Sequence, residues 1–416
     1  MQQKVTNICL FLAPALLFLF PGSYWLGTLM FLAIGMSTLI QRKITFRETI
    51  LLVREVPAMW GFFIYVVFHV FVIAYHGDPT KDFGNIVPFL LAPFVLIAVI
   101  INQPNPKYFW LGCAAGALLA FSIGVTQVYV FHIGRAMAFR DPISFGNTSI
   151  VLGTGALVGL LYCRSIFKSA LAQIFLFSCG LAGLFTSLLS GSKGGWLSLL
   201  MIMLVLGNAM TRSMHMVKRI MLISGCFAIL IAVVSFTPKL PVVDRLVSAY
   251  HGTVEWFKTG NVTEGSASIR LEAFKAGLMA GAQSPVVGLG GKGEQAAFRE
   301  AVNAGQIRKE LLEVNVVDND FISLFSRHGL VGVFGALAVH LGLFYTFWRH
   351  REEPRETSKA LSTMGMLLVL FYIEFGLSVS IFGVSIFRTT YVSLAILLAG
   401  LLISEKRRLA SAAPVA

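Results

Sequence analysis

Arginine and carboxylate side chains lie beside long apolar stretches of this chain, and together they suit chemistry on a lipid-linked anionic substrate. Arg270 lies in Ser-Ile-Arg-Leu-Glu, and Asp318-Asn319-Asp320 directly precedes an apolar stretch. A guanidinium presents a planar fork of donors that fits phosphate oxygens. A carboxylate at such a place can serve as a general base. The pattern favours an enzyme over a plain transporter.

Four further cations stand at short breaks between apolar stretches, and they are candidates to bind the same phosphate groups. Lys193 lies in Ser-Gly-Ser-Lys-Gly-Gly, where small residues leave the backbone close to whatever the lysine contacts. Arg135 and Arg140 lie within residues 134–142, and Arg388 begins the last apolar stretch. We predict that these cations converge on one pyrophosphate. Each alone also fits a surface charge, and Lys193 fits a snorkelling side chain at a tight turn.

Other interpretations of these residues stay open at this point. Asp318-Asn319-Asp320 is an Asp-x-Asp string, which binds a divalent metal in some enzymes, but such short strings are common by chance. The same residues suit a helix N-cap, a role compatible with catalysis. Arg270 has possible acidic partners in Glu264 and Glu272. The five cysteines lie in apolar stretches without metal-ligand spacing, so we predict neither a metal site nor a cofactor.

Long apolar stretches must position these residues. The chain has 416 residues, 56% of them hydrophobic and only 13% charged, whereas soluble domains carry about 25% charge. The apolar runs are continuous rather than alternating, which predicts an all-α polytopic membrane protein. We predict about twelve spans, at residues 6–22, 24–40, 58–75, 85–101, 109–131, 147–163, 170–190, 194–210, 219–236, 321–347, 360–380 and 386–403.

The distribution of basic residues predicts how the spans are oriented. Eighteen of the 33 lysines and arginines fall on one side, and five fall in the short breaks of the other side. The positive-inside rule therefore puts both termini in the cytoplasm. The net charge of +13 follows from this bias and from attraction to the head groups of membrane lipids. It does not predict nucleic-acid binding, because no soluble basic domain carries it.

One long polar segment interrupts the spans late in the chain. Of the 81 residues from 237 to 317, seventeen are charged, so this segment belongs in water or at the lipid head groups. We predict helices at residues 241–259, 266–282 and 294–313, with a Pro/Gly turn at residues 284–293. One integrated domain results: nine spans (1–236), an outer helical loop (237–320), three spans (321–403) and a cytoplasmic tail (404–416).

Four motifs, taken with their order and spacing, resemble those of bacterial O-antigen ligases and the wider O-antigen ligase and polymerase superfamily. They are Ser-Gly-Ser-Lys-Gly-Gly, Ser-Ile-Arg-Leu-Glu-Ala-Phe-Lys-Ala-Gly, Ser-Pro-Val-Val-Gly-Leu-Gly and Asp-Asn-Asp-Phe-Ile-Ser-Leu-Phe-Ser-Arg-His-Gly-Leu-Val-Gly-Val-Phe. The number of spans and the place and length of the outer loop agree over nearly the whole chain.

The resemblance implies a GT-C-like helical fold and an inverting glycosyltransferase that needs no metal. Such ligases take O-antigen from undecaprenyl pyrophosphate and join it to lipid A-core, the last joining step of lipopolysaccharide biosynthesis. The reaction takes place at the periplasmic face of the inner membrane. The implied partners are therefore the undecaprenyl-pyrophosphate-linked glycan donor, the lipid A-core acceptor and membrane lipids.

The resemblance also implies roles for particular residues. The loop arginine of the family falls on Arg270, and its second key arginine falls on Lys193, which keeps the charge but loses the bidentate fork. The histidine proposed as the base falls on Asp318, next to Asn319. We expect Asp318 to accept the proton of the acceptor hydroxyl and Asn319 to orient that hydroxyl. The expected pyrophosphate ligands are Lys193, Arg270 and Arg140, helped by Arg135 or Arg388.

Three other functions remain open from the sequence. An O-antigen polymerase would use the same donor with a second lipid-linked glycan as acceptor, and a protein O-oligosaccharyltransferase would modify a protein. A transporter of lipid-linked glycans would move the substrate without forming a bond, and it would need charge in mid-membrane. The candidate charges gather at one face instead, which favours the enzymes.

Overall fold

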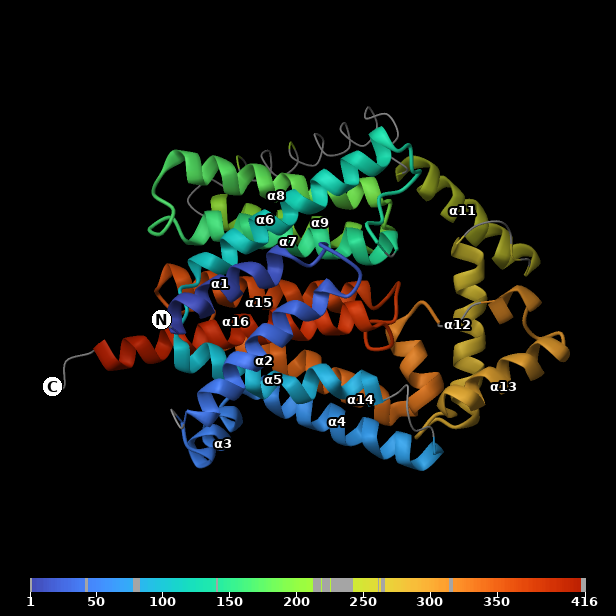
Figure 1. Cartoon of the computed structure of the whole chain (residues 1–416). Helices are drawn as coiled ribbons and strands as arrows, with labels where there is room; N and C mark the ends of the chain where they lie inside the picture. Colours follow the sequence, from blue (N-terminus) through green and yellow to red (C-terminus); the bar gives the residue numbers. More distant parts are fainter. Residues whose placement is uncertain are drawn as a thin grey trace.

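The computed structural model describes residues 2–41, 44–77, 83–139, 141–211, 218, 225, 242–260, 262, 266–313 and 317–412, and these ranges contain helices and no strands (Figure 1). The helices in chain order are α1 (Gln2–Ala15), η1 (Ser23–Trp25), α2 (Leu26–Ile40), α3 (Phe46–Arg54), α4 (Pro57–His76), α5 (Phe83–Asn102), α6 (Lys107–Val125), η2 (Thr126–Val130), α7 (Pro142–Tyr162), α8 (Ala170–Ser190), η3 (Lys193–Gly195), α9 (Trp196–Thr211), α11 (Val242–Thr259), α12 (Ser266–Gln283), α13 (Gly290–Asn303), η4 (Lys309–Glu313), α14 (Asp320–Trp348), α15 (Glu356–Phe375) and α16 (Ser385–Ala412).

The chain is a multi-pass membrane protein. Within the described ranges, nine helical stretches are long and apolar enough to cross a bilayer, and all nine match predicted spans. They are Ser23–Ile40, Pro57–His76, Phe83–Asn102, Lys107–Val130, Pro142–Tyr162, Ala170–Ser190, Asp320–Trp348, Glu356–Phe375 and Ser385–Arg408.

The remaining three predicted spans are not among these nine stretches. The first predicted span, 6–22, is the 14-residue helix α1 followed by a turn at Gly22, which has a positive φ of 91°. The span predicted at 194–210 is α9, with 16 residues. The span predicted at 219–236 lies outside the described residues, apart from residue 225. The total of twelve spans therefore stays a prediction.

Three helices form the centre of the membrane bundle. In the spans of α7, α15 and α16, 89%, 78% and 94% of the residues are buried, and this share is much higher than in the other spans. In α7, small residues allow this packing: a Cβ at Gly183 of α8 would meet the Gly153 backbone at 2.8 Å. Close backbone approach through small residues is how helices associate in a bilayer, where no hydrophobic effect drives them together.

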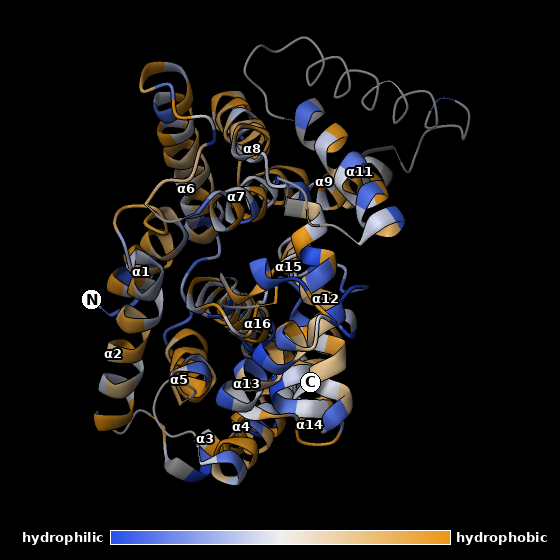
Figure 2. Ribbon diagram, turned by 90° about the vertical axis from the view of Figure 1, so that its right-hand side faces the viewer, coloured by the Kyte–Doolittle hydropathy of each residue, from blue (hydrophilic) through white to orange (hydrophobic). Residues whose placement is uncertain are grey.

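The polar segment forms a helical layer over one end of the bundle. Figure 1 shows α11, α12 and α13 at the end opposite to the two termini, and Figure 2 views that end with its hydrophilic faces toward the reader. This arrangement agrees with the predicted separation of the loop from the termini. The first two predicted helices match α11 and α12.

The third predicted helix of this layer was wrong in its extent. Helix α13 already begins at Gly290 and ends at Asn303, and the separate turn η4 follows. Gly305 has a φ of 68°, a left-handed conformation that an α-helix cannot continue through. Glycine at this point was the feature of the sequence that should have split the prediction.

A break inside α14 joins the outer layer to the bundle. Gly329 is non-helical, with φ 63° and ψ −160°. The segment 285–289 enters the break: Leu330 N–H donates to Pro285 O at 2.8 Å, and Leu289 N–H donates to Ser326 O at 3.0 Å. The Pro-Val-Val-Gly-Leu part of the third motif thus satisfies backbone groups that the broken helix leaves open, as non-helical backbone at membrane depth requires.

Candidate functional site

Three cations from separate parts of the chain line one cavity at the end of the bundle that carries the outer layer. The cavity has a volume of about 350 Å³. Arg135 comes from the loop between η2 and α7, Lys193 from the turn between α8 and α9, and Arg270 from α12. The other lining residues are Ile143, Gly191, Ser192, Gly194 and Ser378. Arg135, Lys193 and Arg270 are three of the five cations that we expected to converge, and their binding of a pyrophosphate stays a prediction.

The turn that carries Lys193 is tight because its small residues allow close contacts. Gly191 ends α8 with a φ of 60°. Ser192 Oγ donates to Asn147 Oδ1 of α7 at 3.0 Å, which fixes the turn against the buried centre. A Cβ on Gly194 would overlap Ser378 Oγ, so glycine is needed for the approach to the α15–α16 linker. The Ser-Gly-Ser-Lys-Gly-Gly motif therefore serves to seat the half-buried Lys193 at the cavity wall.

The loop that carries Arg135 is held from both sides. Arg135 Nε donates to Ser190 O at 2.8 Å, at the carboxyl end of α8, where helix carbonyls lack partners within the helix. On the other side, Gln127 Oε1 accepts from the Met137 and Ala138 backbone N–H groups at 2.9 and 3.1 Å. Arg135 is thus both a cation of the cavity and a clamp on the end of α8, which the helix dipole favours.

Arg270 forms an ion pair with the residue predicted as the base. Its Nε lies 3.1 Å from Asp318 Oδ2, and the side chains are 23% and 39% exposed. Glu272, the other described acidic candidate, accepts from Trp256 Nε1 and from the Arg308 backbone instead. The alternative partner Glu264 lies outside the described residues. The contact with Asp318 is made through Nε, and Arg270 is also among the residues that line the cavity.

The three residues of the Asp-Asn-Asp string have three different environments. Asp318 faces Arg270. Asn319 is the N-cap of α14, where its Oδ1 accepts from Ile322 N–H at 3.0 Å and its Nδ2 donates to Leu377 O at 3.3 Å. Asp320 is buried, and its Oδ1 accepts from Phe382 N–H at 3.0 Å. The N-cap predicted for this string is confirmed at Asn319, and the catalytic role of Asp318 stays a prediction.

Of the two other predicted phosphate ligands, Arg388 lies away from the cavity lining and Arg140 is not described by the structure. Arg388 is 3% exposed, binds the backbone carbonyl of Phe382, and reaches Gly84 O at 3.4 Å. It is not among the residues that line the cavity, and these contacts give it a structural role between α5 and α16. Arg140 lies outside the described residues.

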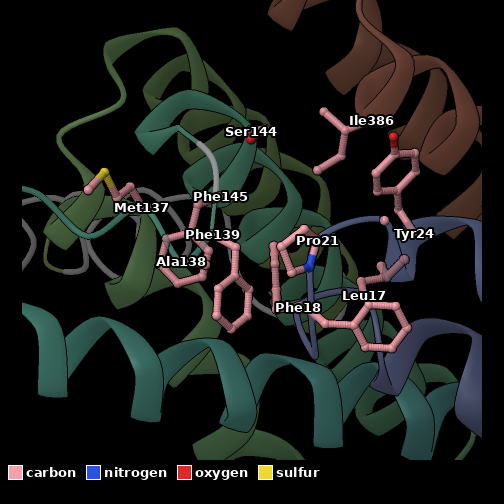
Figure 3. Close-up of a pocket in the computed structure, with 12 residues that line it drawn as sticks. Leu17, Phe18, Pro21, Tyr24, Met137, Ala138, Phe139, Ser144, Phe145 and Ile386 are labelled. Carbon is pink, nitrogen blue, oxygen red and sulfur yellow. The ribbon is translucent and has the colours of Figure 1, made fainter.

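An apolar cavity lies beside the loop that carries Arg135. It has a volume of about 320 Å³ and is lined by Leu17, Phe18, Phe20, Pro21, Gly22, Tyr24, Met137, Ala138, Phe139, Ser144, Phe145 and Ile386. Figure 3 shows Phe18, Pro21 and Phe139 around its space. Met137–Phe139 lie two to four residues after Arg135, and Ser144 directly follows Ile143 of the cationic cavity. One loop thus borders a cationic and an apolar cavity, which is the pattern that an amphiphile with an anionic head requires.

Some polar residues of this region were not singled out from the sequence. Ser378 lines the cavity, and Ser198 Oγ donates to Glu374 Oε2 at 2.6 Å nearby on α9 and α15. Single serines in apolar stretches carry no distinguishing spacing, so only the fold reveals them. Across the part of the chain that the structure describes, no group of three or more His, Cys, Asp or Glu side chains is placed to hold a metal ion.

Comparison with known proteins connects this site to a family. The model of the O-antigen ligase family matches residues 177–337, a stretch that contains Lys193, Arg270 and Asp318. An uncharacterized protein of Haemophilus influenzae is similar to this chain, with 22% identity over 384 residues, 89% of this chain and 93% of that protein. The family match supports assignment of the chain to the O-antigen ligase family, as the resemblance predicted, and indicates a membrane glycosyltransferase of the ligase or polymerase type.

Proposed function

We propose that this chain, taken as a protein of the O-antigen ligase family, is an inverting glycosyltransferase that moves O-antigen from undecaprenyl pyrophosphate onto lipid A-core at the periplasmic face of the inner membrane. The observation that carries the proposal is the cavity lined by Arg135, Lys193 and Arg270. Three cations from three separate segments line the cavity, and no carboxylate is among its lining residues in the described part of the chain. Even with Asp318 paired to Arg270, this concentration of positive side chains attracts an anionic ligand such as a pyrophosphate.

In the proposed reaction, the three cations stabilise the leaving group. As the bond between the sugar and the phosphate breaks, negative charge grows on the pyrophosphate oxygen. Pre-positioned donors near that oxygen lower the barrier, because the charge develops where they already point. Three cations can do the work that Mg²⁺ does in other transferases, so we propose that no metal is needed.

Asp318 is proposed to take the proton from the attacking hydroxyl of the acceptor. Its ion pair with Arg270 holds the carboxylate beside a residue of the cationic cavity, where the donor phosphates are proposed to bind. Attack on the anomeric carbon from the face opposite to the pyrophosphate inverts that centre. Asn319, fixed by its cap and by its bond to Leu377 O, is proposed to orient the acceptor.

The apolar cavity beside the Arg135 loop is proposed to take the first isoprenoid units of the carrier. Its residues Phe20 and Phe139 are 45% and 54% exposed, so its rim opens outward rather than into the bundle. The carrier would then cross from the bilayer into the cationic cavity along one short loop.

The test is ligation with purified protein, lipid-linked donor and lipid A-core. Formation of modified lipid A-core with release of undecaprenyl pyrophosphate supports the proposal. Longer lipid-linked chains would instead identify a polymerase, and a glycosylated protein would identify an oligosaccharyltransferase. Movement of the donor across vesicles without any new glycosidic bond would reject the enzymatic function altogether.

A further inference from the structure

A short helix joins two spans at the end of the bundle that holds both termini, and it has the character of an interfacial helix. α3 is strongly amphipathic and begins with a capping box, in which Thr45 and Glu48 bond each other. Ile50 and Leu51 are exposed, whereas Leu52 is buried. A helix of this kind, with apolar and basic faces, lies in the plane of the membrane interface.

A cavity of about 490 Å³ lies where α3 meets α4. Val53 and Arg54 from α3 and Met59, Trp60 and Phe63 from α4 line it. Trp60 and Phe63 are 48% and 60% exposed, and α4 is a membrane span, so the cavity opens toward the bilayer. Trp60 Nε1 donates to Arg54 O at 3.1 Å, which places the indole at the polar edge of the lipid, where tryptophan is enriched.

The charge at the rim of this cavity is positive. Arg54 is exposed and makes no ion pair within the described ranges of the chain. Glu48 is engaged at its own helix start: the Thr45 N–H and hydroxyl each donate to it at 2.8 Å, which lowers its pKa. Arg349, from the end of α14, donates to Glu55 O at 3.2 Å and brings a second guanidinium to the same edge. The neighbouring carboxylate of Glu55 is exposed.

We propose that this cavity binds one anionic glycerophospholipid of the leaflet on the side of the termini. The phosphate binds Arg54, whose planar donors suit phosphate oxygens. One acyl chain lies against Met59, Trp60 and Phe63. An apolar groove with the exposed Arg54 among its lining residues matches a lipid in chemistry, whereas a soluble phosphate would leave the groove empty. The site is independent of the proposed transferase site at the opposite end of the bundle.

The test uses Trp60 as a reporter in reconstituted, full-length protein. Its fluorescence is isolated by subtracting that of Trp60→Phe protein, and it is quenched with lipids brominated in the acyl chain. We expect brominated phosphatidylglycerol to bind beside Trp60 about fivefold more tightly than brominated phosphatidylcholine, the factor that one basic side chain supplies at an anionic surface. Equal quenching by the two lipids overturns the proposal.

The matched variants are Arg54→Gln and Arg47→Gln, each measured against its own Trp60→Phe derivative. Both arginines belong to α3 and both are exposed, but only Arg54 lines the cavity. We expect Arg54→Gln to abolish the preference for phosphatidylglycerol and Arg47→Gln to retain it. A similar loss in both variants would show general attraction to an anionic surface, and would overturn the specific site. Unchanged preference in Arg54→Gln would overturn it as well.

Discussion

Arg270 and Asp318 bring opposite charges together at the place where the proposed reaction needs both. Their bond of 3.1 Å joins α12 of the outer layer to the start of α14. Because both side chains are partly exposed, the pair contributes little to stability by itself. Its importance in the proposed reaction is geometric, because the cation proposed to bind the donor phosphates positions the carboxylate proposed to receive the acceptor proton. The two residues should therefore act as a coupled unit in catalysis.

Replacing Arg270 tests the cation of this pair. We expect Arg270→Ala to lower kcat by about 100- to 1,000-fold, the usual cost of losing one stabilising donor. Arg270→Lys should recover part of this, because it keeps the charge without the fork. The exposed Arg299 on α13 gives the matched control, and Arg299→Ala should be close to wild type. Turnover of Arg270→Ala near the wild-type rate would remove it from the site.

Replacing Asp318 tests the proposed base. Asp318→Asn keeps the shape but cannot accept the proton, so we expect kcat to fall by about 100- to 10,000-fold, with donor binding retained. The exposed Asp244→Asn on α11 is the control. In the double variant with Arg270→Ala, the loss should be smaller than the product of the single losses. Full additivity would contradict the coupling, and an active Asp318→Asn would exclude it as the base.

The sequence predicted the three cations of the cavity, but it also suggested Arg388 and missed the lining residue Ser378. Arg135 was recognisable because a cation at a short outer break departs from the expected charge bias, and Lys193 and Arg270 were recognisable from the motifs that contain them. The prediction for Arg388 rested only on its place at the start of a span. Sequence position does not tell which way such a side chain turns, and Arg388 turns inward to backbone carbonyls. Ser378 was missed, since a lone serine has no spacing to mark it.

At the scale of elements, the α8–α9 turn controls the width of the cationic cavity. A Cβ on Gly194 would overlap Ser378 Oγ and lie 3.1 Å from Ser378 Cβ, so in Gly194→Ala the Ser378 hydroxyl must rotate and the turn and the α15–α16 linker must give way slightly. We expect a loss in kcat/KM for the donor of up to about 100-fold, the size that a misplacement of about 1 Å can cause. Ser378→Gly should restore much of the activity in the double variant.

The control for this prediction is Gly134→Ala in the neighbouring loop. A Cβ there would meet no atom within 4 Å, so activity should not change. Circular dichroism and thermal unfolding would verify that Gly194→Ala is folded. If Ser378→Gly gives no recovery, the overlap of these two side chains is not the cause of the loss.

The apolar pattern of the sequence predicted most of the spans, but it did not predict the break inside α14 or the short helix α3 between two spans. The apolar pattern of α14 continues through Gly329, so nothing in it revealed that segment 285–289 fills a gap in the helix. The short helix α3 was also missed, because its basic residues were attributed to a cytoplasmic break. The Thr-x-x-Glu capping box of α3 can be read from the sequence, whereas the positive φ of Gly329 depends on the tertiary contact with segment 285–289. The long spans were predictable because a continuous apolar run is sufficient to indicate each of them.

At the scale of the whole molecule, the orientation of the bundle determines which of its two charged ends faces the periplasm and which faces the cytoplasm. We expect Glu300→Cys, in the outer layer, to react with a membrane-impermeant maleimide in cells with a permeable outer membrane. Glu352→Cys, whose side chain is 81% exposed at the opposite end, should react only after the inner membrane is opened. The four described native cysteines, from α1, α6, α8 and the end of α7, provide the unlabelled background. The reverse labelling pattern would place the cationic cavity in the cytoplasm and contradict the proposed function.

The charge balance of the whole molecule leads to the prediction about metals. A pyrophosphate brings several negative charges to an end of the bundle where Arg135, Lys193 and Arg270 already line the cavity, with one carboxylate paired to Arg270. Because these cations are fixed in the fold, the donor should be neutralised without Mg²⁺. We expect ligation by purified protein to proceed at an unchanged rate in EDTA. Activity that is lost in EDTA and restored by Mg²⁺ would show that the three cations are insufficient, and that a metal completes the site.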